Sequence, residues 1–152
     1  MSFEIDALKA TRSNIQKAIS NLTVKELNTI PSGFSNSIIW NVGHVIVTQQ
    51  LLHYKMSGLK PLVDEELIGR YKKGTVPTDN YASEEEIESI KSLLENTLEW
   101  LEQDIDAGNF KTFEAYETSY GIKLSSFDQA LYFITVHEGL HLGYIMAMRK
   151  SV

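Results

Sequence analysis

The stretch ALYFITVHEGLHLGYIMAM, residues 130–148, is the part of the chain from which its fold can be worked out. Its apolar residues recur every three or four positions, which is the spacing of one face of an α-helix. His137 and His141 fall on that same face, one helical turn apart. The segment therefore predicts a helix that carries two imidazoles among its core-facing residues.

Two imidazoles at positions i and i+4 of a helix can bind the same metal ion. The run HEGLH, residues 137–141, also matches the H-E-x-x-H pattern of zinc proteases. Those enzymes usually take a third ligand from further along the chain, but no His, Asp, Glu or Cys follows His141. The protease interpretation is therefore disfavoured, and a third protein ligand has to come from upstream.

Composition and charge narrow the class of protein. A chain of 152 residues, 43% of them hydrophobic, is long enough for a single globular domain, residues 1–152, with its own core. The absence of cysteine excludes disulfides, thiolate ligands and a cysteine nucleophile. A net charge of −6 without a basic stripe disfavours nucleic-acid binding. We expect a cytoplasmic protein that does not bind membranes, because no apolar run approaches the roughly 18 residues of a membrane span and the first residues do not resemble a signal peptide.

Helical periodicity extends over three further segments. The first runs from about Phe3 to Asn21 and the second from about Ser37 to Met56. The third opens at Ser83, where Ser83 and Glu86 have the spacing of a capping box, and ends before Gly108. Four amphipathic helices, each with one apolar face, favour an all-α fold, a four-helix bundle around a shared core.

Two connections separate these helices. Gly58–Ala82 is a long connection between the second and third helices, with a short helical turn expected near Asp64–Tyr71. Loops of this length often cover functional sites. The aromatic stretch Phe110–Leu124 predicts an irregular or short extended crossover, and Ser125 or Ser126 is expected to cap the last helix.

A third histidine, His44, lies on the apolar face of the second helix together with Trp40 and Val47. Burying imidazole costs free energy unless its nitrogens have partners, and this cost applies to all three residues. We therefore expect His44, His137 and His141 to converge on one divalent metal ion with at least one open coordination position, as in catalytic zinc sites. The alternative is that the histidines are core residues with ordinary hydrogen bonds.

Other polar and aromatic residues are weaker candidates. His53 is half a turn out of phase with the first histidine of its helix, so it is interpreted as a surface or packing residue. Glu138 is a candidate general base or partner of a metal ligand, although a salt bridge outside the site is the favoured interpretation. Arg12 interrupts an apolar stripe and is expected to extend its charged end to solvent, or else to point at a ligand. Tyr120 and Tyr144 are interpreted as core aromatics rather than pocket residues.

Three runs, WNVGH (40–44), YGIKLS (120–125) and HEGLHLGYI (137–145), resemble the DinB-like superfamily of metal-binding four-helix bundles. The resemblance covers essentially the whole chain in helix order and spacing. It implies metal ligands at His44, His137 and His141, with Zn²⁺ or Ni²⁺ as the ion, and homodimers are common in the family. Members of known activity are thiol-dependent transferases and isomerases, and others are described as metal-dependent hydrolases.

These predictions lead to two hypotheses about function. In the first, the protein is a metal-dependent thiol S-transferase or hydrolase that acts on a small electrophilic substrate, with a low-molecular-weight thiol as co-substrate. The substrate would lie between the second and fourth helices, under a roof formed by Gly58–Ala82. In the second, the protein is a non-catalytic module that binds a metal or a small molecule. The sequence does not decide between an enzyme and a binding module.

Overall fold

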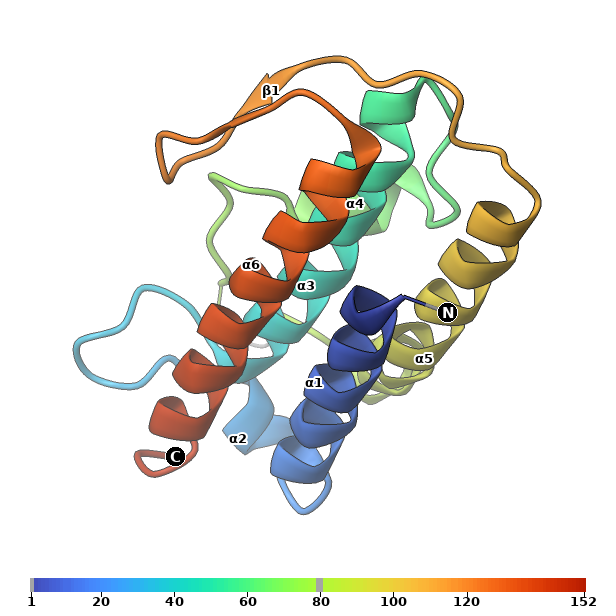
Figure 1. The fold of residues 1–152 in the computed structure, drawn as a ribbon. Coiled ribbons are helices and arrows are strands. Elements are labelled where there is room, and N and C mark those ends of the chain that lie inside the picture. The colour runs from blue at the N-terminus through green and yellow to red at the C-terminus, as the bar shows by residue number, and fades with distance from the viewer. Residues whose placement is uncertain (1, 79–80) are drawn as a thin grey trace.

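Four long helices form a bundle in the computed structural model, which describes residues 2–78 and 81–152 (Figure 1). They are α1 (Phe3–Ile19), α3 (Ile38–His53), α5 (Glu84–Asp106) and α6 (Phe127–Met148). α1 packs against α5 and α6, and α3 packs against the same two helices. The predicted all-α bundle is confirmed, and the ends of its long helices agree with the periodicity to within a few residues.

Short elements occupy the connections. α4 (Glu65–Tyr71) begins after Asp64 and confirms the predicted helical turn, and a single 3-10 turn, η1 (Lys55–Ser57), follows α3. β1 (Tyr116–Glu117) and β2 (Lys123–Leu124) form an antiparallel ribbon within the predicted crossover. α2 (Val24–Asn28) was not predicted, although Thr23 and Glu26 form the capping box that starts it. The described chain therefore has six α-helices rather than four.

The directions of the helices explain the lengths of the connections. In Figure 1, α1 and α6 run in one direction and α3 and α5 run in the other. Because α3 and α5 are parallel, the chain between them must return along the bundle, which requires the long connection 58–82. Residues 79 and 80 of that connection lie outside the described residues. The crossover only has to span the end of the bundle where α5 finishes and α6 begins.

Each long helix begins after a serine whose hydroxyl accepts a hydrogen bond from a backbone N–H of the first turn. These serines are Ser2, Ser37, Ser83 and Ser126. At Ser83 the other half of the predicted capping box is used differently. The Glu86 carboxylate accepts a 2.8 Å hydrogen bond from the Tyr71 hydroxyl and pairs with Arg70, so it ties α4 to α5.

The core of the bundle consists of two apolar clusters with a polar layer between them. One cluster includes Ile15 of α1 and Ile145 of α6, and the other includes Leu8 and Ile134 of the same two helices. Buried polar side chains occupy the intervening positions on all four long helices: Arg12, Gln49, Thr97 and Glu138. The three candidate metal ligands lie at this level of the bundle, because His137 and His141 flank Glu138 on α6.

One face of α6 is exposed and uncharged. Between residues 131 and 148, the exposed residues of the helix are all apolar, aromatic or small: Tyr132, Val136, Gly139, Leu140, Gly143, Tyr144, Met146 and Ala147. Despite this apolar surface, none of the helices in the described ranges has both the length and the hydropathy needed to span a membrane.

Candidate metal centre

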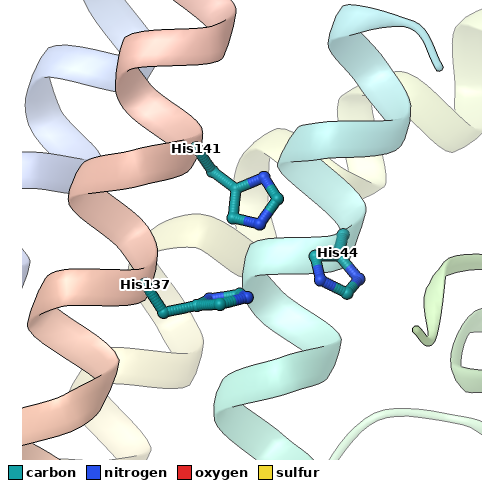
Figure 2. Close-up of side chains that lie close together, drawn as sticks. All are labelled: His44, His137 and His141. Atoms are coloured by element: carbon teal, nitrogen blue, oxygen red, sulfur yellow. The ribbon is translucent and has the colours of Figure 1, made fainter. Parts of the chain in front are cut away.

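Three histidine rings meet in the space between α3 and α6 (Figure 2). His44 comes from α3, and His137 and His141 come from adjacent turns of α6. The ring centroid of His44 lies 5.2 Å from that of His137 and 4.9 Å from that of His141. One nitrogen from each ring lies within 4.8 Å of the others. The structure therefore brings together all three residues that the sequence singled out.

Two contacts orient the His44 ring, a hydrogen bond at its edge and an aromatic ring stacked on its face. Its Nδ1 lies 2.7 Å from the backbone carbonyl oxygen of Tyr71, and since a carbonyl only accepts, Nδ1 carries the proton. The Trp40 indole stacks on the other side, with ring centroids 4.6 Å apart. These contacts leave the lone pair of Nε2 facing the cluster, with the Thr48 hydroxyl 3.3 Å away.

Gly43 permits the approach of Tyr71 to His44. A Cβ atom at residue 43 would lie only 2.4 Å from Cδ1 of the Tyr71 ring. Any side chain there would push α4 away from α3 and withdraw the carbonyl group that holds the histidine. The glycine in the run WNVGH therefore leaves the space that Tyr71 needs to hold the following residue, His44.

His141 is oriented by Asn41, which lies one turn before His44 on α3. The Asn41 amide nitrogen donates 2.8 Å hydrogen bonds to the Ser37 carbonyl and to Oδ1 of Asn36. Its own Oδ1 must then be the atom that accepts from Nδ1 of His141, at 2.7 Å. Nδ1 of His141 is therefore protonated, and its Nε2 lone pair is available to a metal ion.

His137 has a buried nitrogen without a partner. Its Nδ1 makes no hydrogen bond within the described part of the chain, and such an atom costs about 1–3 kcal/mol when left unsatisfied. Burial, together with the neighbouring His141 and His44, lowers the pKa of His137 to about 3. Burial likewise lowers the pKa of His141 to about 3. At neutral pH the rings are uncharged, which is the form that binds metal ions.

The donor set fits a divalent transition metal ion. Zn–N bonds are about 2.0–2.1 Å long, so small rotations of the three rings would bring their nitrogens to one ion. Neutral imidazole suits Zn²⁺, Ni²⁺ and Fe²⁺. A three-nitrogen set also leaves a coordination position for an exogenous ligand, because zinc in closed structural sites takes four protein ligands.

A pocket of about 300 Å³ opens beside the three rings. α3 and α6 form two of its walls, as the hypothesis of a cleft between these helices requires. The third wall is the crossover, through Tyr116, Thr118, Ser119 and Tyr120, whereas the described residues of Gly58–Ala82 contribute only Lys73. The predicted roof is therefore wrong for these residues, because the crossover forms the wall that the connection was expected to provide.

The two tyrosines interpreted as core residues are on the surface. Tyr120 lines the pocket with 48% of its surface exposed, and Tyr144 is 44% exposed beside His141. The core interpretation was wrong for both. Tyr120 belongs to an exposed turn of the crossover, and Tyr144 to the outward face of α6.

Glu138 points away from the three histidines and toward α1. Its carboxylate accepts hydrogen bonds from Nε and Nη2 of Arg12, the shortest at 2.7 Å, and both side chains are almost fully buried. Nη1 of the same guanidinium donates to the Leu94 carbonyl and to the Thr97 hydroxyl. The predicted salt bridge of Glu138 is present, but the expectation that Arg12 reaches solvent was wrong, because its partners lie inside the bundle.

His53 is fully buried, which excludes the surface alternative for this residue. Its ring contacts Phe127, with centroids 5.2 Å apart, and its Nδ1 donates to the Gln49 carbonyl at 3.0 Å. α3 is buried on nearly all sides, so a residue out of phase with His44 still meets protein. His53 is not part of the group formed by His44, His137 and His141.

Comparison with known proteins identifies the family. A sequence profile of the DinB superfamily matches residues 7–145. The chain belongs to the DinB superfamily. Its structure is similar to the crystal structure of a conserved protein from Enterococcus faecalis, with a TM-score of 0.72 over 100% of this chain and 98% of that chain. The two sequences are 13% identical, so this similarity supports the fold alone. No curated protein matches the chain.

Sequence reasoning missed the residues that orient the ligands in this DinB-superfamily protein. No role was predicted for Asn41, although its position three residues before His44 places it on a neighbouring part of the same helix face. Tyr71 gave no signal, because it contributes a backbone carbonyl from another element rather than a side chain.

Proposed function

We propose that the protein is a metal-dependent enzyme in which His44, His137 and His141 hold one divalent ion, Zn²⁺ or Ni²⁺. Its reaction would be the transfer of a thiol, or of water, to a small electrophilic substrate. The observation that carries this proposal is a trio of neutral imidazoles beside a pocket whose described lining residues include no carboxylate or thiolate to close the coordination sphere.

A bound ion in this position would lower the pKa of a thiol or water molecule and so supply a nucleophile at neutral pH. The residues of the chain have two other tasks. Tyr71 and Asn41 hold two of the imidazoles in the tautomer that leaves Nε2 unprotonated. The apolar side chains of the pocket, among them Leu51 and Phe133, exclude water from one side of the site.

Elemental analysis of untagged protein tests the first step of this proposal. We expect about one divalent ion per chain, lost in His137→Ala and retained in Arg149→Gln, a control on the exposed end of α6. The second step is tested by screening the metal-loaded protein against electrophiles with several low-molecular-weight thiols and with water alone. Turnover no greater than that of His137→Ala in every combination would contradict an enzymatic role.

One observation favours a second candidate, a non-catalytic module that binds a metal or a small molecule. The only carboxylate beside the histidines in sequence, Glu138, is held by Arg12. None of the described residues that line the pocket is an acid, so these residues offer no carboxylate general base. Absorption spectra of Co²⁺-substituted protein distinguish the candidates. A spectrum that changes when azide or a thiol is added indicates an exchangeable position, and an unchanged spectrum favours the module.

A further inference from the structure

The pocket beside the histidines has an uncharged, apolar part. Leu51 and Leu52 of α3 face Phe133 and Leu140 of α6, and Met56 follows at the end of α3. At about 300 Å³, the pocket is at the small end of the range for ligand sites, roughly 300–1,000 Å³. A water molecule takes about 30 Å³ of liquid, so the space suits a ligand of roughly ten non-hydrogen atoms.

Among the described residues, the charged side chains that line this pocket are all positive. The chain has 20 acidic and 14 basic residues, yet Lys55 and Lys73 are the only described lining residues with a full charge. Neither ammonium group has an ion-pair partner within residues 2–78 and 81–152. In an acidic protein, a concave apolar site with two unpaired cations and no anion concentrates negative ligands.

We infer that the pocket binds a small amphipathic carboxylate, with its apolar body against Leu51, Met56 and Phe133 and its acid group attracted by the positive charge of Lys55 and Lys73. This inference rests on the proposed function, since it names the class of substrate that would be presented to the metal site. The rest of the ligand would lie in the pocket that opens beside the histidines.

The identity of the cations limits the chemistry of the acid group. The pocket has no arginine fork and no row of backbone N–H groups at a long-helix N-terminus, the features that favour multiply charged phosphate groups. Two ammonium groups are compact point charges, which attract a carboxylate without the bidentate geometry that arginine supplies. A monocarboxylate uses this attraction while keeping the rest of the ligand apolar.

A pair of matched probes tests the inference. 3-Phenylpropionate and its neutral amide, 3-phenylpropionamide, have the same apolar body and differ in charge. Isothermal titration calorimetry should show that the carboxylate binds about tenfold more tightly than the amide, the sum expected from two partly exposed ion pairs. The double variant Lys55→Gln/Lys73→Gln should lose that difference and bind both probes like the wild-type protein binds the amide. The control Lys72→Gln, an exposed lysine beside Lys73 that does not line the pocket, should behave as wild type.

Repeating the titrations with metal-free and Zn²⁺-loaded protein separates this inference from the proposed function. Carboxylate binding that requires the ion and ignores the lysines would overturn the inference and leave the metal site intact. Lysine-dependent binding by a protein that takes up no metal would support the inference and contradict the proposed function. Equal affinities for the acid and the amide would also overturn the inference.

Discussion

Oδ1 of Asn41 accepts a 2.7 Å hydrogen bond from Nδ1 of His141, a residue one hundred positions further along the chain. This bond joins α3 to α6 at the level of the candidate metal site. It fixes both the orientation of the ring and the nitrogen that faces the other histidines. Partners of this kind typically contribute 10–100-fold to metal affinity.

Replacement of Asn41 should therefore weaken metal binding without removing a ligand. We expect Asn41→Leu to bind Zn²⁺ about 10–100-fold less tightly than wild type, measured by competition with a chromophoric chelator. Asn41→Asp keeps an acceptor for the Nδ1–H group and is expected to retain most of the affinity. Wild-type affinity in the leucine variant would show that the bond has no role in binding.

Gly43→Ala should damage both the fold and the site. The new methyl group would meet the Tyr71 ring at 2.4 Å, and relieving that overlap moves the carbonyl that holds His44. We expect the free energy of unfolding to fall by about 1–3 kcal/mol in urea denaturation. The control is Gly69→Ala in α4, where nothing lies within 4 Å of the added Cβ and stability should be equal or higher. Equal effects of the two changes would contradict this account of residue 43.

The Arg12–Glu138 pair should be more important to stability than any exposed ion pair. Arg12→Met leaves a buried carboxylate without its partner, and we expect a loss of about 3–5 kcal/mol in the free energy of unfolding. The double variant Arg12→Met/Glu138→Leu should recover most of that loss, because both charges are gone. Lys91→Met, which breaks an exposed pair with Glu88 on α5, should cost less than about 1 kcal/mol.

The same pair tests the role of Glu138. Glu138→Gln keeps the size of the side chain and should leave metal content unchanged, because the carboxylate faces Arg12 rather than the histidines. A variant that folds and binds metal normally but loses all turnover would instead identify Glu138 as a general base.

His53 should make the protein less stable in weak acid. Burial lowers the pKa of His53 to about 3, despite the opposing effect of its bond to Gln49, whereas an unfolded histidine titrates near 6.5. Between these values the unfolded chain binds a proton that the native chain does not. Above about pH 6.5, His53 therefore makes its full contribution to the free energy of unfolding, and this contribution decreases as the pH falls toward 3.

Urea denaturation at pH 7.5 and pH 5 measures this contribution, which is about 2 kcal/mol at pH 5 for one such histidine. In His53→Phe, the difference between the two pH values should be smaller by that amount. Since other buried histidines also titrate, the comparison of variant with wild type isolates residue 53. An identical difference in both proteins would show that His53 becomes protonated in the folded state.

The exposed face of α6 should be covered by a second copy of the chain. Gly139 and Gly143 lie on this face, and no atom of the described residues lies within 4 Å of the position of their Cβ atoms. A helical glycine costs about 1 kcal/mol relative to alanine. Close packing of another helix would compensate for that cost. The apolar residues of this face are each 43–66% exposed, namely Tyr132, Val136, Leu140, Tyr144 and Met146, and a contiguous exposed apolar patch is typical of an interaction surface.

Sedimentation velocity tests this prediction. The wild-type chain should be a homodimer, and Val136→Glu should be a monomer, because a charge would be buried at the centre of the contact. Ser92→Glu places the same charge on the exposed side of α5 and should remain dimeric. A wild-type protein that stays monomeric at high concentration would contradict the prediction.

The sequence predicted what depends on local spacing. Apolar periodicity and serine caps predicted the long helices. One i,i+4 pair of histidines, plus a histidine on another apolar face, predicted the group of three histidines. What it missed depends on partners distant in sequence. The burial of Arg12 requires Glu138, which is 126 positions away, and the orientation of His44 requires a backbone carbonyl from α4. α2 was missed although its capping box was present, because five residues are too few to show periodicity.

The polar layer also determines how far α6 can slide along its neighbours. Apolar contacts between Ile, Leu and Val re-form readily when one helix shifts by a turn, about 5.4 Å, but the guanidinium of Arg12 meets Glu138 of α6 and Thr97 of α5 at only one height. Such a shift would carry His141 out of reach of Asn41. A side chain on α1 that does not line the pocket thereby sets the level of two candidate metal ligands, so substitutions on α1 should alter metal affinity without contacting the ion.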